Sequence, residues 1–369
     1  MQSKVYSAIG LMSGSSLDGV DIAYCHFNQN GAWNFSIEET ICVPYSILWE
    51  KRLRNARHID GQSLWQLHAD LGNYFGSITK TFIEQLSLQG KVDFVASHGH
   101  TVFHFPEQKF TSQIGDGAAL AAAVGVPVVC DFRTTDIALG GQGTPIVPIA
   151  DWHLFRQHKL LLNLGGIANI SAKVNESIRA FDVCAANQVL NFLAQQLGSA
   201  FDADGRLAKS GKLDHSLFDK LNALPYFEQE FPKSLDNGFS QLAIIPLLES
   251  FHISTEDKLH TVCEHIAYQV QQHIAKIAVK TQTIFEKKDS ILITGGGAFN
   301  GFLLERIAAH TEVQVVVPDE KTVKYKEALA MAFMGVLRLC GEVNVLHAVT
   351  GASRDSVGGS IYFSPTLPL

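Results

Sequence analysis

The sequence is short of basic residues. Its 369 residues include 29 Lys and Arg against 36 Asp and Glu, which gives a formal net charge of −7 at pH 7. A surface that binds nucleic acid or an anionic membrane needs a surplus of Lys and Arg. The composition therefore argues against both kinds of partner.

Cysteines and long apolar runs are also scarce. The longest weakly polar stretch, residues 114–130, contains Asp116 and Pro127 and is too short to span a bilayer. The N-terminus lacks a basic region followed by a cleavage site. The six cysteines show no paired spacing, which suits reduced thiols in a cytoplasm: Cys25, Cys42, Cys130, Cys184, Cys263 and Cys340. We therefore expect a cytoplasmic protein.

Two common nucleotide-binding motifs are absent, but residues 5–27 (VYSAIGLMSGSSLDGVDIAYCHF) carry a different pattern. The Gly-Lys-Ser/Thr of a P-loop and the spaced glycines of a dinucleotide fold are both missing. Instead, apolar runs at 5–12 and 20–27 flank a Gly/Ser turn, which predicts paired strands. Glycines allow a close backbone approach, and clustered N–H groups bind phosphate oxygens. Taken alone, such a turn is more often only structural.

Chain length and periodicity predict two lobes of the α/β class. The chain exceeds the ~250–300 residues at which a single core stops growing. Strand patterns alternate with helical ones, and residues 131–148 have the Gly, Pro and polar content of a loop. We expect strands at 92–97, 127–130, 290–294 and 313–317, and helices at 61–86, 118–124, 187–197, 259–285 and 326–339.

A second copy of the opening pattern occurs at 160–172 (LLLNLGGIANISA), again a strand, a Gly turn and a strand. A third Gly turn, at 295–300, follows the strand expected at 290–294. The repeat suggests two related lobes. Open α/β sheets place ligands beside strand ends, so three such turns would form a nucleotide site in a cleft between the lobes.

Taken together, these segments resemble the anhydro-N-acetylmuramic acid kinase family, which belongs to the sugar kinase/Hsp70/actin superfold. The resemblance runs through LMSGSSLDGVD, SHGHT, IGDGAALA, DFRTTDIALGGQGTPIVP, LNLGGIANI, FDADGRLAKSG, TGGGAFN and KEALAMAF. It implies a two-lobed, duplicated ribonuclease H-like α/β fold with a cleft between the lobes. We place one lobe at 1–157 plus about 328–369 and the other at 158–327.

The resemblance also implies an activity. ATP and water would convert 1,6-anhydro-N-acetylmuramic acid to N-acetylmuramic acid 6-phosphate and ADP, with ring opening coupled to phosphorylation of O6. Such a reaction serves the recycling of cell-wall fragments. ATP, Mg²⁺, a small amino-sugar substrate and a homodimeric assembly are the implied cofactors and partners.

Nucleotide contacts are expected at the three Gly turns. Met12 stands where many relatives of the superfold carry a metal-organising Asp, so Mg²⁺ would be held mainly by phosphates and water. The alternative role for Asp18 and Asp21 is structural, as solvated carboxylates that form the turn. The expected contacts are Gly14, Ser15, Ser16, Leu17, Asp18, Gly19, Val20, Asp21, Gly165, Gly166, Asn169, Gly295, Gly296, Gly297 and Asn300. At positions 295–297, any side chain would clash with the base or ribose of the nucleotide.

Ring opening needs a carboxylate that activates water, and the resemblance implies that Asp182 is this catalytic base. Family members usually continue Phe-Asp with Thr-Gly-Pro-Gly-Asn, whereas this chain has Val183-Cys184-Ala185-Ala186-Asn187. The carboxylate and the Asn remain, but the glycines and proline are gone. The alternative role for Asp182 is a helix N-cap before residues 187–197.

Sugar contacts are expected around the SHGHT and GGQGTP segments. The lactyl carboxylate of the substrate requires a cation or oriented hydrogen-bond donors. The expected contacts are His98, Arg133, Asp136, Gln142 and Glu327. A metal site at His98, His100 and His104 is a weaker hypothesis, and no resident metal is expected. The segment 201–211, with Asp202, Gly205 and Lys209, would either close over the nucleotide or stabilise its lobe.

The residues alone are compatible with two other functions. One is a kinase of the same superfold that acts on an ordinary hexose or amino sugar. The other is a non-catalytic protein that binds a nucleotide or sugar, which only the altered loop after Asp182 favours. Fold alone does not decide between them.

Overall fold

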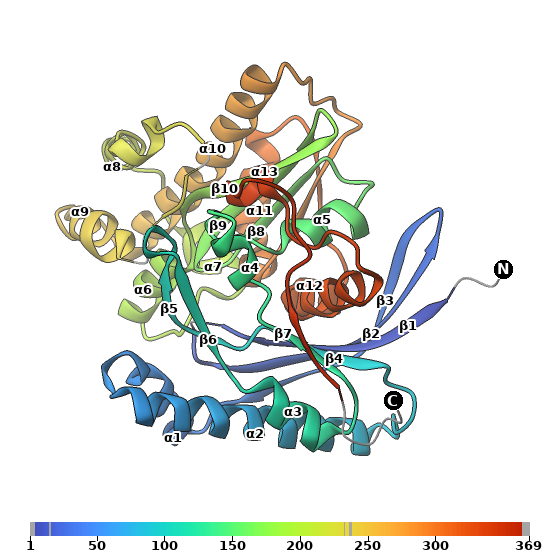
Figure 1. Cartoon of the computed structure of the whole chain (residues 1–369). Helices are drawn as coiled ribbons and strands as arrows, with labels where there is room; N and C mark the ends of the chain where they lie inside the picture. The colour runs from blue at the N-terminus through green and yellow to red at the C-terminus, as the bar shows by residue number, and fades with distance from the viewer. Residues whose placement is uncertain (1–3, 15, 232, 236–237, 364–369) are drawn as a thin grey trace. The chain divides into compact units, whose positions relative to one another are not determined.

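The computed structural model describes residues 4–14, 16–231, 233–235 and 238–363 (Figure 1). The chain divides into two compact units. Unit 1 comprises Met1–Phe155 and Tyr325–Leu369, and unit 2 comprises Arg156–Lys324. Glu327 therefore belongs to unit 1.

Unit 1 is built on a six-stranded mixed sheet of order β13-β7-β4-β1-β2-β3. Strands β1, β2 and β3 form an antiparallel meander, while β4 and β7 run parallel to β1. β13 closes the edge antiparallel to β7. The bounds are β1 Val5–Ser13, β2 Gly19–Asn30, β3 Ala32–Pro44, β4 Phe94–Ser97, β7 Val128–Cys130 and β13 Ser360–Tyr362; β5 His100–Phe105 and β6 Phe110–Ile114 form a separate hairpin.

Unit 2 repeats the same plan in a five-stranded sheet of order β10-β9-β8-β11-β12. Its first three strands are an antiparallel meander, and β11 and β12 run parallel to β8. The bounds are β8 Leu160–Leu164, β9 Ile167–Val174, β10 Ser177–Ala185, β11 Ser290–Thr294 and β12 Gln314–Val316. Apart from the edge strand β13 of unit 1, both sheets thus follow the order 3-2-1-4-5 with the same strand senses. The predicted α/β class and the predicted duplication are confirmed.

Helices cover both faces of the unit 1 sheet (Figure 1). Ile9 and Leu11 of β1 share an apolar cluster with Leu71 and Phe75 of α2. Phe27 of β2 faces the other way and packs on Phe333 of α12. The bounds are α1 Ile47–Arg54, η1 Ala56–His58, α2 Gly61–Gln85, η2 Pro106–Gln108, α3 Gly117–Val124, α4 Thr134–Ala138, α5 Pro148–Leu154, α12 Glu320–Cys340 and α13 His347–Thr350.

The core of unit 2 lies between one face of its sheet and three helices. Leu160, Leu162 and Leu164 of β8 point toward that core, which includes residues of α6, α10 and α11. The bounds are α6 Asn187–Gln196, η3 Ala203–Gly205, α7 Arg206–Ser210, α8 His215–Asn222, η4 Pro225–Glu228, η5 Ser240–Ile244, α9 Ile245–Glu249, α10 Thr255–Thr281, η6 Gly296–Phe299 and α11 Gly301–His310. No helix in the described ranges is long and apolar enough to cross a membrane.

Strand β1 and helix α12 approach each other closely at Gly10. A Cβ atom built on Gly10 would lie 1.8 Å from the carbonyl oxygen of Ala328. Any side chain at this position would therefore push the helix away from the sheet. The contact places Glu327, the neighbour of Ala328, at a defined position beside the first hairpin.

Several predicted boundaries were wrong. The segment 131–148 is not all loop, since α4 forms within it and α5 begins at Pro148. Helix α10 ends at Thr281 instead of continuing to residue 285, because Gln282 takes the left-handed conformation (φ 53°). Helix α12 begins six residues before the predicted start, and Tyr325 departs from helical geometry inside it.

Substitution of Gly10 by alanine is expected to destabilise unit 1 by about 3 kcal/mol, because a backbone carbonyl cannot yield to the new methyl group. Urea and thermal unfolding monitored by circular dichroism measure the loss. Gly61→Ala is the matched control, since a Cβ there meets nothing within 4 Å. Equal stability of the two variants would contradict the packing argument.

Candidate functional site

The first predicted hairpin is present in unit 1. Residues of β1 and β2 pair up to Ser13 opposite Val20, and the turn between them contains Leu17 at φ 60°. The Ser16 hydroxyl donates to Oδ1 of Asp18 at 2.7 Å. A Cβ on Gly14 would meet no atom closer than 3.5 Å, so packing alone does not explain this glycine. Ser15 lies outside the described residues.

A group of charged side chains gathers beside this hairpin. Burial raises the pKa of Asp21, and the neighbouring Asp18 carboxylate raises it further, although a hydrogen bond with Cys42 opposes the shift. Glu327 keeps an exposed surface, but the protein around its carboxylate limits the hydration of the charged form. This loss of hydration raises the Glu327 pKa, the Asp21 charge adds to the rise, and Lys326 and Arg133 oppose it. The fold therefore brings residues from three distant segments of unit 1 together.

His98 and Arg133 form a direct pair. The Arg133 Nε–H donates to Nε2 of His98 at 3.0 Å, and His98 Nδ1 lies 3.0 Å from the carbonyl oxygen of Gly99. Burial lowers the His98 pKa to about 3, with the Arg133 charge adding to the effect. The histidine is therefore neutral, with its proton on Nδ1, and it presents a lone pair to the guanidinium.

The other two histidines of this loop have separate partners. His100 Nδ1 lies 3.0 Å from the Ser13 hydroxyl, which also contacts Tyr45. His104 Nδ1 lies 3.0 Å from the hydroxyl of Thr111. Across the described part of the chain, no three His, Cys, Asp or Glu side chains are grouped so that they could hold a metal ion. The structure thus gives the histidine metal hypothesis no support.

Asp136 differs from its predicted role as a sugar contact. Its side chain is fully buried, and its two oxygens accept hydrogen bonds from Thr350 Oγ1 and the Gly143 N–H, each at 2.7 Å. These bonds hold the 139–143 turn instead of facing a ligand. The neighbouring Gln142 side chain is exposed.

The second and third Gly turns lie side by side in unit 2. β8 and β9 join through Gly165 and Gly166, and β11 runs parallel to β8 with Thr294 opposite Asn163. Asn300 caps helix α11 by accepting from the Leu303 N–H at 2.9 Å. Two of the three predicted turns therefore belong to one end of one sheet.

The reason for two of the 295–297 glycines differs from the prediction. A Cβ on Gly295 would lie 2.5 Å from Asn163 Oδ1, and one on Gly297 would lie 2.6 Å from Cβ of Leu164. Close packing inside the protein therefore already requires glycine at both positions. Gly296 is different, because its nearest neighbour would be 3.5 Å away.

Asp182 stands at the end of a polar row that crosses four strands. Thr294, Asn163, Asn169 and Asp182 are successive partners in the register of β11, β8, β9 and β10. Paired residues share a face of a sheet, and here it is the face opposite the apolar core of unit 2. Sequence reasoning missed Asn163 and Thr294; the available signal was a polar residue inside an otherwise apolar strand.

The Asp182 carboxyl group is half-buried and partly anchored. Burial raises its pKa, while the Leu235 N–H, which donates to Oδ2 at 2.8 Å, acts in the opposite direction. The N-cap alternative is wrong, because Asp182 lies within β10 and the residue that precedes α6 is Ala186. No donor in the described ranges reaches Oδ1, which leaves this oxygen able to take a proton.

The segment 201–211 has a structural role in unit 2. The buried Asp202 carboxylate accepts from the N–H groups of Leu207 and Ala208, each at 2.9 Å. Gly205 has φ 69°, and a Cβ on it would lie 2.2 Å from Asn300 Oδ1. Lys209 pairs with Glu305 at the surface. These contacts favour stabilisation of the unit over closure on a nucleotide.

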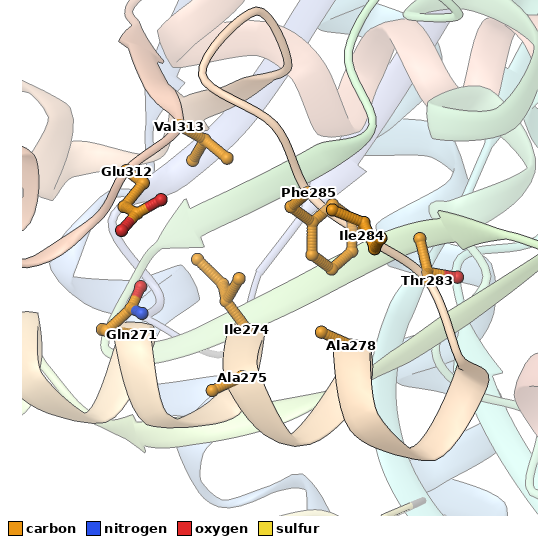
Figure 2. Close-up of a pocket in the computed structure, with 9 residues that line it drawn as sticks. All are labelled: Gln271, Ile274, Ala275, Ala278, Thr283, Ile284, Phe285, Glu312 and Val313. Atoms are coloured by element: carbon orange, nitrogen blue, oxygen red, sulfur yellow. The ribbon is translucent and has the colours of Figure 1, made fainter.

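A cavity of about 250 Å³ occupies a different part of unit 2 (Figure 2). It lies between α10 and the segments 283–285 and 312–313, and no predicted site residue lines it. Its walls are Gln271, Ile274, Ala275, Ala278, Thr283, Ile284, Phe285, Glu312 and Val313.

The two sheets of order 3-2-1-4-5 place the protein in the class of duplicated ribonuclease H-like α/β proteins. A family profile described as anhydro-N-acetylmuramic acid kinase matches residues 6–364. The chain belongs to this family.

Similar curated proteins carry the same description. The anhydro-N-acetylmuramic acid kinase of Shewanella denitrificans is 33% identical, over 96% of this chain and 97% of the relative. The kinase of Salinibacter ruber is 35% identical, over 96% of each chain. Among solved structures, the hexokinase from Schistosoma mansoni complexed with glucose has a TM-score of 0.36 and 11% identity, over 89% of this chain and 85% of the hexokinase.

His98 is expected to remain a neutral Nδ1–H imidazole between pH 5 and pH 8, because burial and Arg133 both disfavour its charged form. Long-range ¹H–¹⁵N NMR spectra of histidine-labelled protein report the tautomer and charge. Loss of one signal set in His98→Gln assigns the resonance. A titration midpoint near 6.5, or a proton on Nε2, would contradict the described pair.

Proposed function

We propose that this protein is an ATP-dependent kinase that opens the 1,6-anhydro ring of anhydro-N-acetylmuramic acid with water and phosphorylates O6. The observation that carries the proposal is the Asp182 carboxyl group at the end of the polar row, where the Leu235 N–H anchors Oδ2 and no donor among the described residues reaches Oδ1. Family membership over residues 6–364 supplies the substrate and product. The reaction would serve the recycling of cell-wall fragments.

The chemistry follows from one base and one transferred phosphoryl group. Asp182 Oδ1 takes a proton from water as the water oxygen bonds to the anomeric carbon. The C1–O6 bond breaks and its electron pair passes to O6. O6 then bonds to the γ-phosphorus, and the bond from that phosphorus to the ADP oxygen breaks. The products are N-acetylmuramic acid 6-phosphate and ADP.

The Gly turns are proposed to contact ATP, because phosphoryl transfer depends on positioning and charge compensation. In unit 1 these contacts are Gly14, Ser15, Ser16, Leu17, Asp18, Gly19, Val20 and Asp21. In unit 2 they are Gly165, Gly166, Asn169, Gly296 and Asn300, with Gly295 and Gly297 shaping the turn. A Cβ on Gly14 or Gly296 would make only ordinary contacts at 3.5 Å, so packing does not require glycine there, which supports a role in close approach to a ligand.

Mg²⁺ would enter with ATP as part of the substrate. Mg²⁺ keeps several waters and commonly takes only one or two protein carboxylates. In this proposal phosphates and water hold Mg²⁺, and Asp18 or Asp21 contacts the bound waters. A homodimeric state and a cytoplasmic location are also parts of the proposal, and they rest on the family resemblance.

Arg133 and Glu327 are proposed to face the sugar, with His98 holding the guanidinium of Arg133 in place. Arg133 supplies the positive charge that a lactyl carboxylate requires. Asp136 acts indirectly, by fixing the turn that carries Gln142.

Release of ADP from Mg·ATP with three acceptors tests the proposal. The acceptors are anhydro-N-acetylmuramic acid, N-acetylmuramic acid and a set of ordinary hexoses and amino sugars. ADP formed only with the anhydro sugar supports the proposed reaction. Turnover of an ordinary sugar would identify the alternative kinase, and no turnover with any sugar would leave a binding protein.

Asp182→Asn is expected to bind ATP normally but to lose turnover by about 10²–10⁴-fold, because the amide cannot accept the water proton. In the wild type, kcat should fall on acidification with a midpoint above the usual range of an Asp, since burial raises the Asp182 pKa. Steady-state kinetics and ATP-binding calorimetry measure both effects. Near-normal turnover of the variant would remove Asp182 from the role of base.

A further inference from the structure

A β-bulge interrupts strand β10 at Asp182. The register against β9 shifts between Asp182 and Cys184, so that Val183 has no direct partner. A bulge frees backbone groups from the ladder and changes the direction of a side chain. Asp182 therefore has polar backbone groups available for partners outside the sheet.

One neighbouring segment, residues 226–235, forms hydrogen bonds with the backbone N–H, the backbone carbonyl and the carboxyl group of Asp182. The Asp182 N–H donates to the carbonyl oxygen of Lys233 at 3.2 Å. The Tyr226 hydroxyl donates to the carbonyl oxygen of Asp182 at 2.6 Å. The Leu235 N–H donates to Oδ2 of the carboxyl group at 2.8 Å. The described residues of 226–235 are called the clamp below.

The clamp is itself fastened to the rest of unit 2. Lys276 of α10 donates to the carbonyl oxygen of Phe227 at 2.6 Å. Lys233 donates to the carbonyl oxygen of Tyr226 at 3.0 Å, and its ammonium lies 4.1 Å from the centre of the Tyr226 ring. Phe231 stacks on Phe181 with ring centres 4.8 Å apart. Lys276 thus fastens the clamp to α10, and the Phe231 ring fastens it to β10 beside Asp182.

We propose that Tyr226 is a positioning residue, which acts through the backbone of Asp182 to hold its carboxyl group in the orientation needed to activate water. This inference rests on the proposed function. The hydroxyl fixes the bulge from one side while the Leu235 N–H holds one carboxylate oxygen, so the other oxygen has a single direction. The clamp therefore determines where Asp182 points, although the 183–186 segment departs from the family pattern.

The clamp also affects ionisation. The Leu235 N–H favours the charged carboxylate and opposes the larger effect of burial. The nearby Tyr226 hydroxyl and Cys184 thiol stay neutral, since burial raises the pKa of both. Burial lowers the Lys233 pKa to about 8 and the pKa of His273, on α10, to about 4. Loss of a contact that holds the clamp should weaken the hydrogen bond from the Leu235 N–H to Asp182 and raise the Asp182 pKa.

Tyr226→Phe removes the hydroxyl and keeps the ring under Lys233. We expect kcat to fall about 10- to 100-fold through misplacement of the base, while KM for ATP and sugar changes less than about threefold. The acidic limb of the kcat profile should move to higher pH by about 0.5–1 unit. Tyr268→Phe is the matched control, because it makes the same change in the same unit on α10, where the ring packs on Phe218.

A direct titration of Asp182 keeps the test independent of turnover and of His273. The ¹³C carboxyl signal of labelled Asp, assigned by its loss in Asp182→Asn, should titrate at higher pH in Tyr226→Phe than in the wild type or Tyr268→Phe. Lys276→Met, which loosens the clamp at Phe227, should shift it in the same direction by less. An unchanged Asp182 titration in a folded Tyr226→Phe variant would overturn the inference, whether or not the protein phosphorylates the anhydro sugar.

Discussion

The close approach of strand β1 to helix α12 at Gly10 is the packing constraint on which the charged group of unit 1 depends. With 1.8 Å between a hypothetical Cβ and the Ala328 carbonyl oxygen, only glycine permits the contact. The contact places Glu327, which is more than 300 residues from the first hairpin in sequence, within the electrostatic range of Asp21 and Arg133. A local steric requirement in the sheet thereby assembles a site from both ends of the chain.

Unit 2 uses the same sheet plan for a different purpose. Its central strand β8 has Asn163 where the corresponding register position of β1 has Met12, and its third strand has Asp182 where β3 has Cys42. Polar residues therefore line one face of the unit 2 sheet near its strand ends. The bulge at Asp182 then turns this carboxyl group toward the clamp. Of the two related units, unit 2 therefore carries the proposed base.

Local sequence patterns predicted the regular elements well, because apolar periodicity and Gly turns act over short distances. The β1–β2 and β8–β9 hairpins and the helices near 61–86 and 187–197 are present as expected. Features that depend on tertiary contacts were not predictable in this way. The burial of Asp136 requires Thr350, 214 residues away, and the bulge in β10 is visible only once its register with β9 is known.

In the candidate site, too, local features were predictable and tertiary contacts were not. Its residue types followed from the family resemblance, but their partners did not. Tyr226 gave no signal in the sequence, since its hydroxyl reaches a backbone carbonyl 44 residues away. Likewise, Gly295 and Gly297 looked like ligand contacts, whereas packing against Asn163 and Leu164 already requires them. Long-range packing decides which glycine serves the fold and which leaves space for a ligand.

The proposed reaction depends on water that Asp182 directs to the anomeric carbon as the phosphoryl group is transferred. Turnover of anhydro-N-acetylmuramic acid with Mg·ATP in ¹⁸O-water, followed by mass spectrometry of the sugar phosphate, tests it most directly. We expect one ¹⁸O atom in the anomeric hydroxyl and none in the phosphoryl group, with unlabelled product kept in ¹⁸O-water as the exchange control. Label in the phosphoryl group, or a sugar phosphate without label, would contradict it.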